Sequence, residues 1–289
     1  MDLKDRNGNI VATDNGQDML LKQLYGSVTG RSLLKVLTKP VISKIAGFFL
    51  DTKLSTFMIK PFIEKNNINM EEYVEKNYTS YNDFFTRKVK NDARKIEDDS
   101  HILISPADGR VSVYDIDEDS YFMVKDTPYS VSTITNSQKA AKIYKGGKFV
   151  IIRLCVDNYH RYCYIDNGRK TKNKFTQGRL HTVNPIANDY FKIYKENSRE
   201  CSILYTENFG RVMQIEVGAL MVGRIKNHDQ AGFIYKGQEK GLFEFGGSTI
   251  CLLLEKDSVS IDEDLITNTK EGFETKILMG EHIGVSSIK

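Results

Sequence analysis

The chain of 289 residues contains 40% hydrophobic and 27% charged residues and has a formal net charge of +3 at pH 7. This composition can form a sizeable core and excludes an intrinsically disordered chain. The small positive charge gives no indication of nucleic-acid binding, and no uncharged stretch approaches the roughly 18 residues that a membrane-spanning helix requires.

The spacing of cysteines and histidines argues against disulfide and metal frameworks. The four cysteines form no CxxC pair, which is typical of free thiols in a reducing cytosol. The five histidines show none of the HxH, HxxxH or HxxE spacings of metal ligands. We therefore predict no disulfide and no metal site.

The first hundred residues are predicted to be mainly helical. In PVISKIAGFFL, residues 40–50, apolar side chains recur along one face at helical spacing. Residues 31–65 carry seven Lys or Arg against two Asp or Glu, and Lys35, Lys39 and Lys44 precede or flank that face. A basic amphipathic segment of this kind can lie at an anionic membrane surface. The alternative is a helix that packs its apolar face on the protein's own core.

Short β-rich segments dominate the chain from Ile102 onward. After two further helical stretches, MEEYVEKN and YNDFFTRKV, these segments are ILIS, RVSVYDI, KFVIIRLCV, SILYT, RVMQIEV, ALMVGRI and TICLLLE. Because no long helix connects most of them, we expect mainly antiparallel sheets. The predicted fold is α+β, with a helical, membrane-associating region at 1–95 and a β-rich domain at 96–289 that carries the candidate site residues.

Ser248 is the first residue that could perform chemistry. It follows two glycines in EFGGSTICLLLE, at the start of a predicted buried strand. The segment is not the G-x-S-x-G elbow of hydrolases, because no glycine stands two places after the serine and a strand follows. With so little side-chain bulk before it, the hydroxyl of Ser248 can fold back onto the carbonyl of Gly247. A serine in that position can cleave its own chain, whereas the alternative is a simple turn serine.

Three further residues could support such a serine. Asp108 lies in the Asp-Gly turn of ISPADGRVSV, His160 follows a predicted strand in VDNYHRYC, and His181 lies in GRLHTVNP. Taken alone, an Asp-Gly turn and an isolated histidine beside a strand are more often structural than catalytic. The residue types therefore leave both interpretations open.

Together these segments resemble the phosphatidylserine decarboxylases, self-processing enzymes that make phosphatidylethanolamine. The motifs SYNDFFTRKVKNDARKI, SPADGRV, VDNYHR, GRLHTVNP, FGRVMQIEVGALMVGRI and KGQEKGLFEFGGST occur in the family's order between about Tyr78 and Glu255. The resemblance is weak over the first seventy residues. It implies a pyruvoyl-dependent carboxy-lyase that releases carbon dioxide from phosphatidylserine.

The resemblance also implies how the cofactor forms. In the family, an aspartate and a histidine act on the serine of the GST motif, which forms an ester with the preceding residue. Elimination then leaves an N-terminal pyruvoyl group, which binds the amine of the substrate as a Schiff base and accepts electrons when carbon dioxide leaves. The positions that match are Asp108, His160 and Ser248, with cleavage between Gly247 and Ser248.

The partners and location follow from the same resemblance. Cleavage would give a β chain of residues 1–247 and an α chain of residues 248–289 from one precursor. The substrate is a phospholipid in a membrane, so we expect peripheral association with the cytoplasmic face of the cell membrane. No nucleic-acid partner is expected, and a homodimer is left open.

Two positions depart from the family pattern. Gly246 stands where many members have leucine, giving GGST in place of LGST. Cys163 stands where the family's YHRxH motif carries a second histidine, a leading candidate for the charge relay. An ordinary cysteine is mostly protonated at neutral pH and is a poor base. His181 is therefore a second candidate base beside His160.

Two other functions fit parts of the sequence. One is a pyruvoyl-dependent decarboxylase of another amino acid or aminophospholipid. The other is a non-catalytic membrane-binding β-domain, in which Ser248 is only a turn residue. A binding domain would stay one chain, so the intact mass of the purified protein separates it from any pyruvoyl enzyme.

Overall fold

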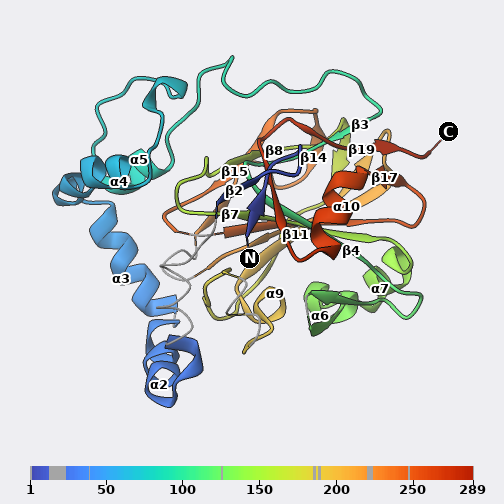
Figure 1. Cartoon of the computed structure of the whole chain (residues 1–289), viewed down its shortest axis with the longest axis horizontal. Coiled ribbons are helices and arrows are strands. Elements are labelled where there is room, and N and C mark those ends of the chain that lie inside the picture. The colour runs from blue at the N-terminus through green and yellow to red at the C-terminus, as the bar shows by residue number, and fades with distance from the viewer. Residues whose placement is uncertain are drawn as a thin grey trace.

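The computed structural model describes residues 2–12, 24–38, 40–124, 126–184, 187, 190–219, 224–246 and 248–288. In Figure 1 the strands form a central body, and α2 to α5 lie to one side of it. These are α2 (Val28–Leu37), α3 (Pro40–Leu50), α4 (Ile59–Lys65) and α5 (Tyr81–Phe85), with the 3-10 helices η1 (Lys53–Met58) and η2 (Met70–Glu72) between them. The further helices within the described residues are α6 (Val131–Thr135), α7 (Gln138–Tyr144), α9 (Ile193–Glu196) and α10 (Glu263–Lys270).

The body is built on one large sheet. Its strands lie in the order β14 (Gly232–Ile234), β9 (Gly168–Lys170), β11 (Arg199–Thr206), β12 (Arg211–Val217), β16 (Ser248–Leu254), β7 (Lys148–Leu154), β4 (Gly109–Asp115), β18 (Glu274–Ile277), β1 (Leu3–Lys4) and β2 (Ile10–Ala12). A further strand, β10 (Lys174–Thr176), pairs with β11. The pairs are antiparallel except for β1 with β18, which are parallel.

Three smaller sheets accompany the large one. They are formed by β13 (Ile225–Asn227), β15 (Glu239–Phe243) and β8 (Arg161–Cys163); by β17 (Val259–Ile261), β19 (His282–Ser286) and β3 (Ile102–Ile104); and by β5 (Tyr121–Val124) with β6 (Thr127–Ser130). Among the residues described, no helix has the length and apolar character required to cross a bilayer.

Strand β16 occupies the centre of the large sheet and is buried on both faces. Ile250 and Leu252 belong to one hydrophobic cluster, which includes Phe243 of β15. Cys251 and Leu253, which point to the opposite face, belong to a second cluster. This double burial explains why TICLLLE is continuously apolar rather than alternating. The predicted strand is therefore confirmed, and it begins at the candidate nucleophile.

The predicted α+β class with mainly antiparallel sheets is confirmed, as is the helix over residues 40–50. The mainly helical N-terminal region also contains two short strands that the sequence pattern did not indicate, because β1 and β2 join the large sheet through β18. MEEYVEKN forms only the short 3-10 helix η2. In ALMVGRI, residues 220–223 lie outside the described part of the chain. The domain boundary at residue 95 stays a prediction.

A buried ion pair ties the middle of the large sheet together. Arg153 of β7 reaches across β4 to Glu274 of β18, with Nε 2.9 Å from Oε1 and Nη2 bound to Oε2. Burial alone would raise the pKa of Glu274, but the charge and hydrogen bonds of Arg153 keep it below its ordinary value. The pair is therefore ionised inside the protein.

We expect Glu274→Gln to lower the free energy of unfolding by about 3–5 kcal/mol, because it leaves the Arg153 charge buried without a carboxylate. Urea denaturation followed by circular dichroism measures this loss. The matched control is Glu118→Gln, which removes an exposed carboxylate that pairs with Lys256, and it should leave the midpoint unchanged. Equal midpoints for the Glu274→Gln variant and the wild type would contradict the assignment.

Candidate active site

Ser248 is enclosed at the start of β16. Its Cα pairs with Leu154 of β7, and its side chain is fully buried. Among the described residues, the hydroxyl oxygen Oγ has no hydrogen-bond partner. A buried hydroxyl without a partner is costly, so such groups concentrate at functional sites. Gly247, the other residue of the expected cleavage site, lies outside the described residues.

The chain reaches Ser248 through a conformation that requires glycine. Gly246 has a φ of +117°, a region that side chains other than glycine rarely adopt. The glycine at this position therefore has a structural reason. A leucine here would be strained unless the backbone of the segment changed.

His160 is held as a neutral base by its backbone surroundings. Its carbonyl accepts a hydrogen bond from the amide of Phe243 at 2.9 Å, which fixes it to β15. Nδ1 lies 2.9 Å from the carbonyl oxygen of Asn158. Because a carbonyl can only accept, Nδ1 carries the hydrogen and Nε2 carries the lone pair. Nε2 is buried and has no partner among the described residues.

The surroundings of His160 also suppress its protonation. Its pKa is lowered to about 3, mainly by burial and in addition by the nearby charge of Arg87, against the opposing effect of the Asn158 carbonyl. The backbone of Gly246 lies close enough to raise the pKa slightly, although it makes no hydrogen bond with Nε2. The ring therefore lies beside the segment that leads into Ser248, in a form able to accept a proton.

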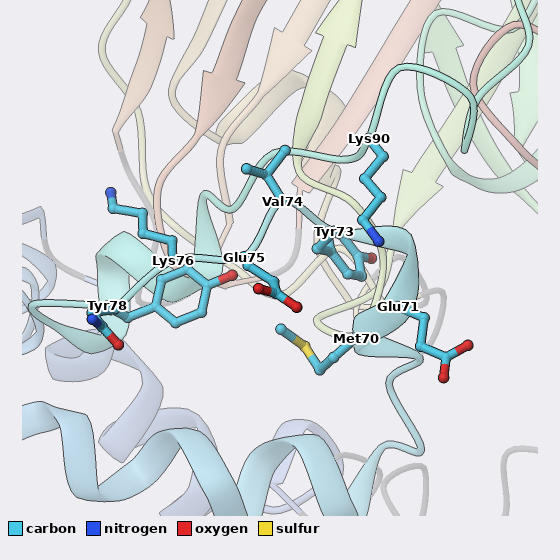
Figure 2. A pocket seen from close by; sticks show the side chains of 9 residues that line it. Met70, Glu71, Tyr73, Val74, Glu75, Lys76, Tyr78 and Lys90 are labelled. Carbon is cyan, nitrogen blue, oxygen red and sulfur yellow. The ribbon is translucent and has the colours of Figure 1, made fainter.

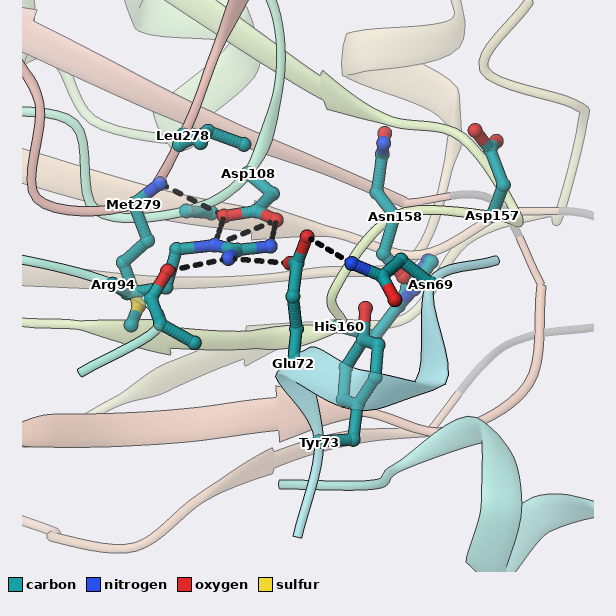
Figure 3. A network of polar contacts seen from close by, with 12 residues as sticks. Asn69, Glu72, Tyr73, Arg94, Asp108, Asp157, Asn158, His160, Leu278 and Met279 are labelled. Atoms are coloured by element: carbon teal, nitrogen blue, oxygen red, sulfur yellow. Dashed lines mark hydrogen bonds and ion pairs between the residues drawn. The ribbon is translucent and has the colours of Figure 1, made fainter. Parts of the chain in front are cut away.

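Asp108 lies in a separate polar network, which Figure 3 shows. Arg94 donates from Nε to Oδ1 at 2.8 Å and from Nη2 to Oδ2 at 2.7 Å, and the amide of Met279 donates to Oδ1 at 2.8 Å. Arg94 Nη1 also donates to Glu72 at 2.9 Å. No hydrogen bond joins Asp108 to His160 among the described residues. The hydrogen-bond partner of the His160 ring is the carbonyl of Asn158.

Cys163 connects β8 to the loop that carries Asp108. The amide of Cys163 donates to the carbonyl of Pro106 at 2.9 Å. Burial raises the pKa of the thiol to about 12, and the negative charge of Asp108 acts in the same direction. The thiol is therefore protonated at neutral pH. It cannot replace the family's second histidine as a proton acceptor.

His181 lies in a different cluster, dominated by aromatic rings. Its ring stacks on Phe191 with centroids 4.2 Å apart, and Tyr25 lies 6.0 Å away. Burial lowers its pKa to about 4, and the charge of Arg179 acts in the same direction, even though a carboxylate oxygen of Glu196 is 4.0 Å from Nε2. Both ring nitrogens lack partners among the described residues. No contact between His181 and either His160 or Ser248 is found there.

A cavity of about 650 Å³ lies beside η2 and the segment that follows it (Figure 2). Its wall is formed by residues 70, 71, 73–78 and 90, and none of Asp108, His160 and Ser248 lines it.

Sequence reasoning assigned no role to Arg94, Arg87 or Asn158. The arginines lie in the FFTRKVKNDARKI motif and Asn158 lies in VDNYHR, so the motifs contained the signal without indicating the contacts.

The sequence comparisons identify the family. A model of the phosphatidylserine decarboxylase family matches residues 81–285. The chain is 49% identical over 271 residues to phosphatidylserine decarboxylase proenzyme 2 of Clostridium acetobutylicum, covering 93% of this chain and 92% of that protein. It is 43% identical to the proenzyme of Ruminiclostridium cellulolyticum, with 92% and 90% covered, and 42% identical to that of Clostridium beijerinckii, with 90% of each covered.

The chain belongs to the phosphatidylserine decarboxylase family, which confirms the resemblance seen in the sequence and the prediction of a carboxy-lyase. The names of the relatives as proenzymes imply that a precursor is processed.

We expect the stability of the protein to fall as the pH decreases from 6.5 towards 4, partly through His181. Its pKa is about 4 in the folded state and 6.5 without the fold, so unfolding takes up protons in this window. His181→Phe keeps the stacking on Phe191 but removes the titrating group, and should make the decline shallower. Urea unfolding at several pH values checks this, and an unchanged slope would argue against a buried neutral ring.

Proposed function

We propose that this chain is a self-processing phosphatidylserine decarboxylase in which Ser248 is the precursor of a pyruvoyl group and His160 is the base. The observation that carries the proposal is that Ser248 Oγ and His160 Nε2 are both buried and have no hydrogen-bond partner among the described residues. The neutral tautomer of His160 and its position beside Gly246 support the same roles. His181 is the second candidate for the base.

The proposed processing step uses groups of the chain alone. His160 Nε2 takes the proton of the Ser248 hydroxyl, and Oγ attacks the carbonyl carbon of Gly247. The peptide bond to the Ser248 nitrogen breaks as the ester bond forms, and that nitrogen gains a proton. Elimination then removes the Ser248 α-hydrogen and releases Gly247 as a carboxylate. Hydrolysis of the resulting dehydroalanine releases ammonia and leaves the pyruvoyl end.

The fold can hold both products together. The proposed α chain, residues 248–289, contains β16, β17, α10, β18 and β19. Strand β16 pairs with β12 and β7, β18 pairs with β4 and β1, and β19 pairs with β3. The α chain therefore stays in the sheets after the peptide bond is cut. The pyruvoyl group supplies an electrophilic carbonyl that accepts the electron pair left when carbon dioxide departs.

Asp108 is proposed to position the site rather than to contact His160. It fixes the loop before β4 through Arg94 and the amide of Met279. The same loop receives the amide of Cys163 at Pro106, and Cys163 is three residues beyond His160. Loss of the Asp108 charge would leave Arg94 without its main partner and loosen this support.

The helical region is proposed to hold the enzyme at the cytoplasmic face of the membrane. Five apolar side chains of α3 and η1 are between 62% and 75% exposed: Val41, Ile45, Phe48, Leu54 and Phe57. Exposure of this extent favours a membrane contact over a helix that buries its apolar face on the protein's own core. Lys35 is exposed nearby, whereas the side chains of Lys39 and Lys44 lie outside the described residues.

We expect the purified protein to consist of residues 1–247 and a fragment of the last 42 residues whose N-terminus resists Edman degradation, because a pyruvoyl end has no amine. Ser248→Ala should stay one chain, and His160→Ala should process at least about a hundredfold more slowly, as typical for loss of a general base. Intact mass spectrometry over time measures both.

His181→Ala provides the matched comparison for the choice of base. Processing at the wild-type rate in His181→Ala supports His160. Wild-type processing in His160→Ala together with arrest in His181→Ala would reverse the assignment. A single uncut wild-type chain, or cleavage of Ser248→Ala, would reject the processing proposal itself.

We expect Phe48→Ser combined with Phe57→Ser to weaken liposome binding at least about tenfold, because each buried phenylalanine contributes about 1.5–3 kcal/mol. Sedimentation with liposomes of increasing phosphatidylserine content measures binding, and added salt should reduce it by screening the lysines. The matched control is Phe233→Ser, which removes an aromatic side chain of similar exposure from β14. Equal loss of binding in the double variant and the control would contradict a specific membrane surface.

A further inference from the structure

Arg87 is a buried cation whose hydrogen-bonding capacity is largely unused. It follows α5 and is 2% exposed. Its guanidinium lies over the rings of Tyr73 and Phe84, at 4.3 Å and 4.8 Å from their centroids. Nη2 donates to the hydroxyl of Tyr73 at 3.2 Å and to the carbonyl of Asp157 at 3.3 Å. Nε and Nη1 are buried without a partner among the described residues.

Two other buried arginines have hydrogen-bond or ion-pair partners that compensate their charge. Arg153 pairs with the carboxylate of Glu274. Arg199, also 2% exposed, donates from Nε to the carbonyl of Ile134 at 2.6 Å and from its terminal nitrogens to further backbone carbonyls. Arg87 has only one backbone carbonyl, that of Asp157, as a partner among the described residues. It pairs with no carboxylate in the described chain, although burying a charge without compensation strongly opposes folding.

Arg87 lies near both the cavity wall and His160. Tyr73 covers the Arg87 guanidinium on one side and lines the cavity in Figure 2. On the other side, the charge of Arg87 is close enough to act on His160. Phe84 belongs to the hydrophobic cluster that includes Leu50, the last residue of α3. Arg87 therefore contacts the aromatic cluster of the helical region and lies near His160.

We infer that Arg87 binds the phosphodiester of the phospholipid substrate. The inference rests on the proposed function and names a residue that selects the substrate head group. The Nε and Nη1 groups of Arg87 supply three N–H donors, and a phosphodiester supplies charged oxygen acceptors. An anion of the substrate would compensate the buried charge whenever the site is filled.

The chemistry of decarboxylation favours the phosphodiester over the substrate's carboxylate. The carboxylate loses its negative charge as carbon dioxide forms. A strong ion pair with Arg87 would therefore stabilise the ground state more than the transition state and slow the reaction. The phosphodiester keeps its charge throughout, so its binding does not oppose the chemical step.

Competitive inhibition of the processed enzyme tests this inference. The probes are glycerophosphoethanolamine, which has a phosphodiester without a carboxylate; L-serine, which has a carboxylate without a phosphate; and ethanolamine, which has neither. In the wild type, glycerophosphoethanolamine should inhibit at least about tenfold more strongly than ethanolamine. Arg87→Gln should weaken inhibition by glycerophosphoethanolamine about ten- to a hundredfold and leave inhibition by L-serine unchanged.

Two variants separate binding from structure. Arg87→Lys keeps the charge with fewer donors and should give an intermediate inhibition constant. Arg199→Gln removes an equally buried arginine whose donors all bind backbone, and should leave the ratio between the glycerophosphoethanolamine and ethanolamine constants unchanged. A change of this ratio in Arg199→Gln equal to that in Arg87→Gln would overturn the inference.

Other outcomes also decide the question. Equal inhibition of the wild type by glycerophosphoethanolamine and ethanolamine overturns the inference even if Arg87→Gln fails to fold. Loss of L-serine inhibition alone in Arg87→Gln assigns the residue to the carboxylate instead. A wild type that is uncut or releases no carbon dioxide from phosphatidylserine rejects the proposed function, while calorimetric titration with glycerophosphoethanolamine still tests Arg87.

Discussion

The burial of β16 on both faces is the constraint on which the site depends. The strand lies between β12 and β7, and its side chains enter two separate hydrophobic clusters. Because Ser248 is the first residue of this strand, its hydroxyl is held inside the protein rather than on a surface loop. A proton that leaves it must therefore pass to a group of the protein. The fold brings His160 to the segment before Ser248 by pairing β8 with β15.

Three side chains with proposed roles carry buried polar atoms that have no hydrogen-bond partner among the described residues. Elsewhere in the core, fully buried Lys240 bonds to Glu216 at 2.7 Å and to Asn227 at 2.6 Å. Ser248 Oγ, His160 Nε2 and two nitrogens of Arg87, in contrast, have no partners among the described residues. Such groups destabilise the folded state, and packing elsewhere must offset their cost. The aromatic cluster around Phe85, which lies 4.2 Å from the His160 ring and 5.2 Å from Phe245, provides part of that packing.

The sequence predicted those features that depend on local pattern. The helix at 40–50 and the strand TICLLLE follow from apolar spacing. Ser248 and His160 were candidates from their local segments, and the resemblance to a known family supplied their expected roles. The strand at Leu3–Lys4 is too short to show a pattern and exists only because β18 offers an edge. The orienting carbonyl of Asn158 is a backbone group, so no residue type could indicate it. The partner of Asp108 depends on how the loop containing Arg94 folds back, which spacing does not determine.

The helical region is hydrogen-bonded to the segment that leads into Ser248. The same contacts therefore link the proposed membrane surface to the proposed cleavage site. Asn82 of α5 accepts a hydrogen bond from the amide of Phe245 at 3.1 Å and donates to Asp51 at 2.8 Å. Arg224 Nη1 bonds to both Asp51 and Glu244, at 2.9 Å and 3.0 Å. Cleavage after Gly247 would free the chain end that contains Phe245. After cleavage no peptide bond would connect that end to β16. The hydrogen bonds above and the ring packing of Phe245 on Tyr81 would then be what holds the end beside His160.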